Sequence, residues 1–195
     1  MKGRADAYAT FLCRPHHGCQ AVSPARSSSP TMPSPEARPP LTLTVAGTTV
    51  RFAWHVDRWT HDVLGADGTR WRSIEKTAAG DDPRWPASPV LVELSALDTP
   101  AGRVILGVGL AGRSHFSASV GPDPAAPDRL RFDLACRVNE PPPWLGSTYR
   151  DSEGLVRIGP GPLVQPPPTT VQWAYAFGSG GLVPLAGARV EPRPD

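Results

Sequence analysis

Apolar and polar residues alternate along most of the chain from residue 41 onward. Apolar residues alternate with threonines over residues 41–45, and after the segment Ala46-Gly47-Thr48 the alternation resumes over residues 50–56. A period of two is typical of strands with one buried face, and the small residues between the two runs favour a turn. The pattern therefore predicts a hairpin, whose second strand continues towards Leu64.

Further alternating segments follow, with short polar turns between them. After the turn signal Asp67-Gly68 these segments are residues 71–76, 90–94, 104–110, 116–120 and 130–138. Connections this short usually join strands that are neighbours in a sheet, so we expect an antiparallel meander. Residues 78–89 contain too many prolines for a regular hydrogen-bonded ladder and are predicted to form a loop.

The C-terminal third of the chain is richer in proline than the segment before it. Prolines interrupt the alternation at residues 141–143, and residues 144–149 are expected to form a turn and a closing edge strand. We predict an all-β domain over residues 41–158, an antiparallel sandwich or flattened barrel of roughly seven to eight strands. Residues 159–195 are predicted to be a Pro-rich spacer with one possible additional strand at 171–177, and the pattern leaves open whether that strand joins the sheet.

The N-terminal segment, residues 1–40, has a different composition from the rest. It contains seven prolines, a run of three serines and no periodic apolar pattern. Its net charge is +3, whereas the whole chain carries +2, so residues 41–195 carry −1. These features predict a disordered, Pro/Ser-rich basic arm.

The amino-acid composition and the net charge of the chain exclude one fold class and disfavour some kinds of partner. The chain of 195 residues has 25 prolines and 19 glycines, which excludes a helical bundle, while 39% hydrophobic residues are enough for a core. Only Lys2 and Lys76 among the 20 basic residues are lysine, a bias typical of the high-GC codon usage of many bacteria. The small net charge disfavours nucleic acid as a partner. The chain has no apolar run long enough for a membrane helix and no convincing secretory segment, so we expect a soluble, cytoplasmic protein with no membrane partner.

The polar face of the predicted sheet is the most informative feature. If Phe52, Trp54 and Val56 point inward, then the intervening residues point outward, since strand side chains alternate. Outward ionisable and aromatic residues of the predicted strands are His55, Asp57, Trp59, His115, Arg131, Asp133 and Arg137. Gly107, Gly109 and Ala111 are expected on the same face, where small residues would form a depression. Because aromatic rings cover sugar rings and charged groups bind hydroxyls, we predict that this set binds a sugar-like or small polar ligand.

Three other interpretations of the same face stay open. It is also compatible with an ordinary solvated sheet surface, or with a second core covered by the segment around Trp173. An enzyme using His55, Asp57 and His115, with or without a metal, is a further alternative, since these residue types suit zinc. His61 is expected to lie roughly 20 Å from His55 on an unbent strand, too far to share the ion. No metal and no cofactor are predicted.

Other candidate chemistry is weaker. The three cysteines do not indicate a disulfide framework, and the spacing of Cys13 and Cys19 with the two intervening histidines matches no common zinc pattern. Cys136 lies on the apolar phase of its strand, which favours a core position. No segment carries a nucleophile elbow, and no two of the strand carboxylates form a pair with defensible spacing; these are Asp57, Glu75, Glu93 and Asp133.

These observations favour a non-catalytic module that binds a small polar ligand or a protein partner. An enzyme and a purely structural or partner-binding domain remain the alternatives. The phase of the strands predicts that Trp54, Phe116 and Phe132 are buried, and that His55, Asp57 and His115 are exposed.

Overall fold

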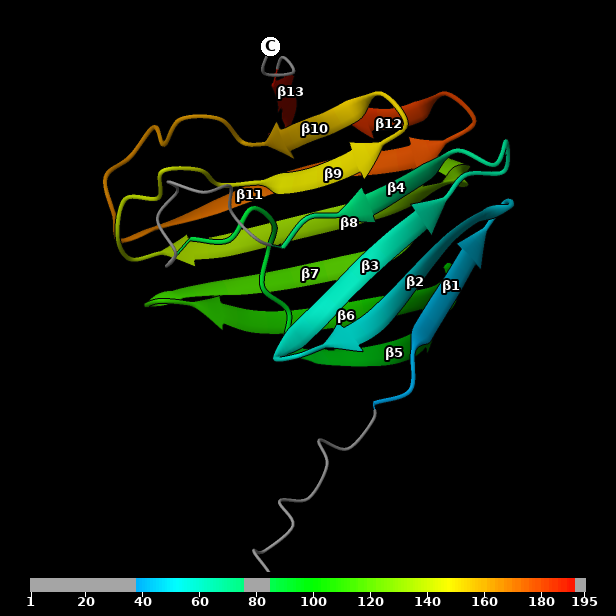
Figure 1. Cartoon of the computed structure of the whole chain (residues 1–195), viewed down its shortest axis with the longest axis horizontal. Helices are drawn as coiled ribbons and strands as arrows, with labels where there is room; N and C mark the ends of the chain where they lie inside the picture. The colour runs from blue at the N-terminus through cyan, green and yellow to red at the C-terminus, as the bar shows by residue number, and fades with distance from the viewer. Residues whose placement is uncertain (1–37, 76–84, 192–195) are drawn as a thin grey trace, which may run out of the picture. The chain divides into compact units, whose positions relative to one another are not determined.

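The computed structural model describes residues 38–75 and 85–191 of the chain, which belong to a compact unit spanning residues 37–195. This unit is an all-β fold of two antiparallel sheets, and neither sheet closes into a barrel (Figure 1). The first sheet has seven strands, in the spatial order β1 (Leu41–Val45), β2 (Thr48–His55), β3 (Arg58–Leu64), β4 (Arg70–Ser73), β9 (Ser147–Asp151), β10 (Gly154–Gly159) and β13 (Arg189–Glu191). The second sheet has six strands, in the order β12 (Gly181–Pro184), β11 (Thr169–Gly178), β8 (Ala126–Val138), β7 (Ser114–Asp123), β6 (Gly102–Ala111) and β5 (Glu93–Thr99).

The predicted all-β antiparallel class is confirmed, and so is the meander from β5 to β8. The described residues contain thirteen strands rather than seven or eight. The additional strands β10, β12 and β13 have three to six residues each, too few for a clear alternation. The segment at 171–177 is part of β11, which pairs with β8 at Val171 and Cys136 and so extends the second sheet instead of covering its face. The predicted arm, residues 1–40, lies almost entirely outside the described residues.

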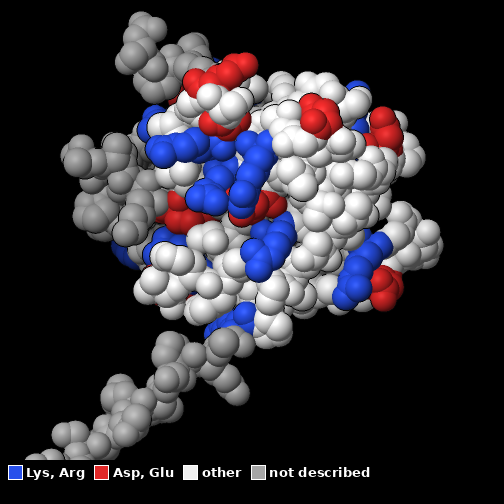
Figure 2. All heavy atoms as spheres, turned by 45° about the vertical axis from the view of Figure 1, so that its right-hand side comes forward, with Lys and Arg blue, Asp and Glu red and all other residues white. Residues whose placement is uncertain are grey.

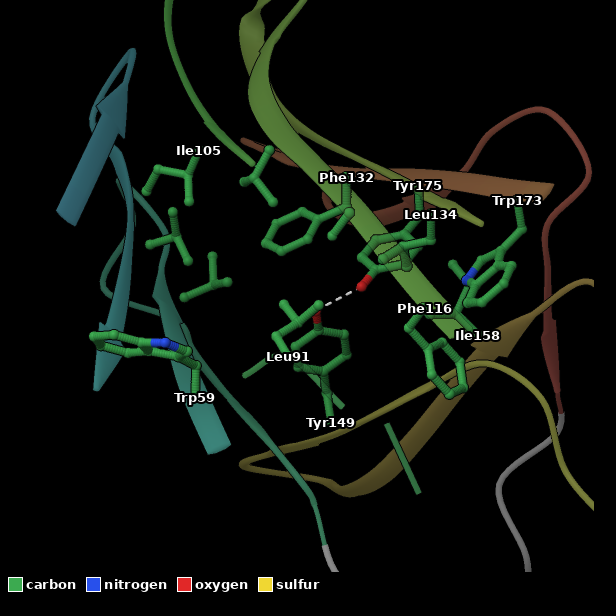
Figure 3. Packing of buried hydrophobic residues seen from close by; sticks show 14 of the residues in the cluster. Trp59, Leu91, Ile105, Phe116, Phe132, Leu134, Tyr149, Ile158, Trp173 and Tyr175 are labelled. Atoms are coloured by element: carbon green, nitrogen blue, oxygen red, sulfur yellow. Dashed lines mark hydrogen bonds between the residues drawn. The ribbon is translucent and has the colours of Figure 1, made fainter. Parts of the chain in front are cut away.

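The core fills the space between the two sheets and is rich in aromatic rings (Figure 3). Phe132 of β8 stacks on Tyr175 of β11, with ring centroids 5.2 Å apart. Phe116 and Phe132 are buried as predicted, whereas Trp54 is only partly buried and packs edge-on against Trp59 at 5.6 Å. Within the described residues no helix is long and apolar enough to cross a membrane.

The hairpin between β2 and β3 reverses the predicted phase of β3. The turn consists of Val56 and Asp57, and the strands on either side pair Trp54 with Trp59 and Phe52 with His61. Directly paired residues point to the same side of a sheet. Trp59 and His61 therefore point into the core with their partners, and the prediction that they face outward is wrong.

Strand β6 also has the opposite phase to the predicted one. Leu106, Val108 and Leu110 are exposed, while Gly107, Gly109 and Ala111 face the core. The cause is a loop that enters the sandwich: a Cβ atom on Gly109 would lie only 2.1 Å from the carbonyl oxygen of Val90. Glycine allows this close approach of two backbones. The depression expected on the outer face is therefore absent from β6, which instead presents apolar side chains there.

Candidate ligand-binding site

An open cavity of about 1090 Å³ lies beside the β2–β3 turn. Its walls come from four segments: residues 55–62 around the turn, 72–75 at the end of β4, 85–90 of the entering loop, and 110–112 between β6 and β7. The volume is in the range of cavities that hold small organic ligands. The same loop that imposes glycine on β6 thus supplies one wall of the cavity.

The turn at the rim of the cavity is strained. Val56 has a φ of 60° and is 80% exposed, and the amide of Asp57 donates to the carbonyl oxygen of His55 over 2.8 Å. This is the hydrogen bond of a γ-turn, whose form with positive φ is rare. A β-branched side chain in this backbone region costs about 1–3 kcal/mol. Such strain tends to occur at functional sites, which makes the rim a candidate for binding.

Asp57 and Arg58 form a two-point ion pair on this rim. The Nε and Nη2 atoms of Arg58 donate to the two carboxylate oxygens over 2.8 and 2.9 Å. The hydrogen bonds from Arg58 lower the pKa of Asp57, and those to Asp57 raise the pKa of Arg58. Both groups are therefore charged near neutral pH, and each neutralises the other.

Glu75 has the least satisfied carboxyl group of the cavity wall. Its Oε1 accepts a hydrogen bond of 2.6 Å from the Ser73 hydroxyl, whereas its Oε2 is enclosed and has no hydrogen-bond partner in the described part of the chain. Burial raises the pKa of Glu75 to about 7, although the Ser73 hydrogen bond and the charge of Arg58 oppose the shift. Near neutral pH this carboxyl group is therefore close to half protonated.

His61 links the cavity wall to the core. Its backbone N–H donates to Ser73 Oγ over 2.9 Å, and its Nε2 lies 2.8 Å from the hydroxyl of Tyr149. The ring stacks on Phe132 with centroids 5.4 Å apart. Burial lowers the pKa of His61 to about 4, despite the opposing charge of Asp62, so the imidazole is neutral at pH 7.

The hydrogen bonds of His61 continue through the core as a hydroxyl chain, which we define as His61, Tyr149, Tyr175 and Ser147. The Tyr149 and Tyr175 oxygens are 2.8 Å apart, and the Tyr175 hydroxyl donates to Ser147 over 2.9 Å (Figure 3). Since Tyr175 uses its proton on Ser147, Tyr149 donates to Tyr175 and accepts from His61. His61 is therefore the tautomer protonated at Nε2. Burial also raises the pKa values of both tyrosines, which stay neutral.

The structure places the seven predicted ligand-binding residues in three different locations. His55 and Asp57 line the cavity, as exposed residues of the turn. Trp59 is 5% exposed and belongs to the core, so it has no open ring face for a ligand. The remaining four lie on the outer face of the second sheet and are not among the residues that line the cavity: His115, Arg131, Asp133 and Arg137. Arg131 is held there by Asp133 at 2.7 Å and by Asp123 at 3.4 Å.

The metal-dependent alternative is not supported by this arrangement. Among the residues that the structure describes, no three His, Cys, Asp or Glu side chains are grouped to hold a metal ion. His55 and Asp57 are together, but His115 is on the second sheet. Cys136 is buried, and burial raises its pKa to about 12, which fits a core residue. The segment with Cys13 and Cys19 lies outside the described residues.

Sequence reasoning missed Arg58, His61, Ser73 and Trp85 as cavity residues, and considered Glu75 only as one of several strand carboxylates. One signal in the sequence points to the missed turn. Large apolar residues occupy even positions from Val50 to Trp54 and odd positions from Trp59 to Val63. A change of parity marks a two-residue turn between paired strands, since the phase of a single strand does not change.

Comparisons with protein-family models, with curated proteins and with solved structures give no match to this chain. The case for a function therefore depends on the cavity and on the charges and hydrogen bonds of its walls.

Proposed function

We propose that this protein is a non-catalytic module that binds a small, uncharged, hydroxyl-bearing ligand, such as a sugar or another polyol, in the cavity beside the β2–β3 turn. The observation that carries this proposal is the Glu75 carboxyl group, which has one partnered oxygen and one enclosed oxygen without a partner. A buried polar atom without a hydrogen bond costs about 1–3 kcal/mol. A ligand hydroxyl that donates to this oxygen would recover that free energy.

The Glu75 carboxyl group can reach such a ligand with little rearrangement. Rotation about the last torsion of a glutamate side chain is soft, because it joins a tetrahedral to a planar carbon. Glu75 already lines the cavity, so the proposal requires only a change of this torsion to present Oε2 to a ligand. The strained Val56, which also lines the cavity, and the half-protonated carboxyl group fit a site prepared for a ligand.

The charges of the walls favour an uncharged ligand. Asp57 is neutralised by Arg58, and Asp62 by Arg70 and Arg72. The remaining wall combines the apolar residues Val56, Ile74, Trp85, Pro86, Val90 and Leu110 with the uncharged polar side chains of Thr60, His61 and Ser73 and with His55. Apolar walls with a few fixed polar groups are the usual lining of small-molecule sites.

The position of Ser73 favours binding over nucleophilic catalysis. Ser73 donates to Glu75 as a nucleophile donates to a base, over 2.6 Å. Its oxygen, however, also accepts the backbone N–H of His61, and the residue is only 6% exposed. A hydroxyl that is fixed on both sides in the wall supports Glu75 and is poorly placed to attack a substrate.

The proposal is tested with the full chain and a panel of neutral monosaccharides and polyols. Trp85 lies in the cavity wall, so a bound ligand is expected to change the tryptophan fluorescence in a saturable way. Glu75→Gln places an NH2 donor at the position of the unpartnered oxygen or, in the other orientation of the amide, at the position of the oxygen that Ser73 binds. It is expected to weaken binding about tenfold or more. Trp85→Phe is expected to remove most of the fluorescence signal.

Glu93→Gln is the matched control, because Glu93 is an exposed residue of β5 and does not line the cavity. It makes the same change of charge and should bind as the parent protein does. Equal affinities of Glu75→Gln and the parent, or no saturable response to any compound of the panel, would overturn the proposal.

A further inference from the structure

A row of charged side chains crosses the outer face of the first sheet. Four residues are successive cross-strand partners: Arg51 of β2, Asp62 of β3, Arg72 of β4 and Arg150 of β9. Arg70, which is paired with Leu64, lies two residues before Arg72 on β4. We call these five residues the arginine row. Figure 2 shows a group of basic side chains around acidic ones on the face turned to the reader. The row thus carries four positive charges and one negative charge.

Asp62 fixes the centre of the arginine row. It binds Arg70 at 2.7 Å and Arg72 at 3.1 Å, from its two different carboxylate oxygens. Burial opposes ionisation of Asp62, but these hydrogen bonds lower its pKa, so it stays charged. Two of the four guanidinium groups are therefore held in place before any partner arrives, which reduces the ordering entropy of binding.

The guanidinium groups at the two ends of the arginine row are not held by a carboxylate in the described part of the chain. Among the described residues neither Arg51 nor Arg150 forms an ion pair or a side-chain hydrogen bond. Arg150 also lies directly opposite Arg72 on the neighbouring strand, and like charges in that position destabilise a sheet. Residues 41–195 carry a net charge of −1, so the four arginines of the row are not part of a general excess of positive charge.

An anionic partner would relieve this repulsion, and the shape of the face indicates which kind. The outward strand positions of β2, β3, β4 and β9 include no Phe, Tyr or Trp, so the face offers no stacking surface for bases or sugar rings. A flat sheet face also cannot enter a groove of duplex DNA. Carboxylates need neither feature, because each one pairs with a guanidinium group through two parallel hydrogen bonds.

We infer that the arginine row is a docking surface for an acidic, extended segment of a partner protein. Neighbouring strands are about 4.8 Å apart, so the row from Arg51 to Arg150 spans about 14 Å. Carboxylates on one side of an extended chain recur about every 7 Å, and two or three of them match this span. The segment would lie across the strands, with its carboxylates on Arg51, on the Arg72 and Arg150 pair, and on Arg70.

The inference is tested by fluorescence anisotropy of a labelled oligoglutamate peptide added to the full chain. Saturable binding that weakens as salt is raised is expected. The double variant Arg51→Gln/Arg150→Gln removes the two free guanidinium groups and leaves the Asp62 pairs intact. It is expected to weaken binding about five- to tenfold, as two surface charge pairs would.

Arg113→Gln/Arg137→Gln is the matched control, because both residues are exposed and lie on the second sheet or its turn. It makes the same change in net charge and should leave peptide affinity within about twofold of the parent. Equal losses in the two double variants would mean that only net charge matters, and would overturn the inference. Absence of peptide binding, or tighter binding of a single-stranded oligonucleotide or of heparin than of the peptide, would overturn it as well. Arg51 and Arg150 do not line the cavity, so either result is independent of sugar or polyol binding there.

Discussion

Two neighbouring groups of buried polar side chains differ in whether their hydrogen bonds are satisfied, and this difference distinguishes a structural group from a proposed binding group. In the hydroxyl chain of His61, Tyr149, Tyr175 and Ser147, each side chain is hydrogen-bonded to the next across the core. At the cavity wall, Glu75 has an enclosed oxygen without a partner. Ser73 connects the two groups, because its oxygen accepts a hydrogen bond from the backbone N–H of His61 and its hydroxyl donates one to Glu75. Satisfied polar groups make the core specific, whereas an unsatisfied one beside a cavity is an unused binding contact.

The largest expected effect follows from removing the apolar support of the hydroxyl chain. Phe132 is 2% exposed and stacks on both His61 and Tyr175. Phe132→Ala is expected to lower the free energy of unfolding by about 3–5 kcal/mol, measured by urea denaturation. The control Leu97→Ala changes a side chain that is 53% exposed and should cost less than about 1 kcal/mol. Similar losses in the two variants would contradict the assignment of the core.

Acid should destabilise the protein through His61. Its folded pKa of about 4 is below the ordinary histidine value of 6.5, so the stability that the neutral imidazole contributes is complete above pH 6.5 and is lost as the pH falls towards 4. The shift corresponds to about 3 kcal/mol at most. The raised pKa of Glu75 acts in the opposite sense over the same range, so the His61 loss is read from a comparison of variants. Urea denaturation between pH 7 and 4 should show that His61→Phe loses less stability on acidification than the parent and His55→Gln do. An unchanged pH dependence in His61→Phe would contradict the neutral, buried imidazole.

A smaller effect is expected from breaking the hydroxyl chain without changing its packing. Tyr149→Phe removes the hydrogen-bond partner of both His61 and Tyr175, and should lower the free energy of unfolding by about 1–3 kcal/mol. Sugar or polyol affinity at the cavity should stay within about twofold of the parent, because Tyr149 does not line it. A loss of affinity with unchanged stability would reverse the roles assigned to the two groups.

The smallest expected effect concerns the strained rim. Val56→Gly relieves the positive φ of an 80% exposed side chain and should stabilise the protein by about 1 kcal/mol. Val164→Gly is the control, since Val164 is 99% exposed without a positive φ and should gain nothing. Thermal unfolding of both variants measures the difference. Destabilisation by Val56→Gly would show that the turn is not strained.

The strand class was predictable because local alternation decides it wherever a strand has one buried face. In β7 and β8 the alternating Phe116, Phe132 and Leu134 are buried as the pattern indicates. In β6 the same pattern fails, because the inner face is set by the backbone of Val90, which is distant in sequence and packs on Gly109. Periodicity identifies an apolar face but not which face meets the core.

The candidate site was less predictable for a related reason. His55 and Asp57 are neighbours in sequence and do share the cavity, so local spacing was enough to group them. His115 and Arg131 were assigned to the same face without a register between the sheets, and they lie on the other sheet. The unpartnered oxygen of Glu75 depends on which loops pack around it. No sequence pattern encodes a missing partner.

The most direct test of the difference between the two groups is the titration of the Glu75 carboxyl group by ¹³C NMR, with Glu75→Gln used to assign its signal. Burial is expected to place its midpoint at about 7, and Ser73→Ala should raise it further, because the Ser73 hydrogen bond lowers the pKa. A midpoint near the ordinary glutamate value of 4.5 in the parent protein would mean that the carboxyl group is solvated or paired. The cavity would then lack the unsatisfied group on which ligand binding is proposed to depend.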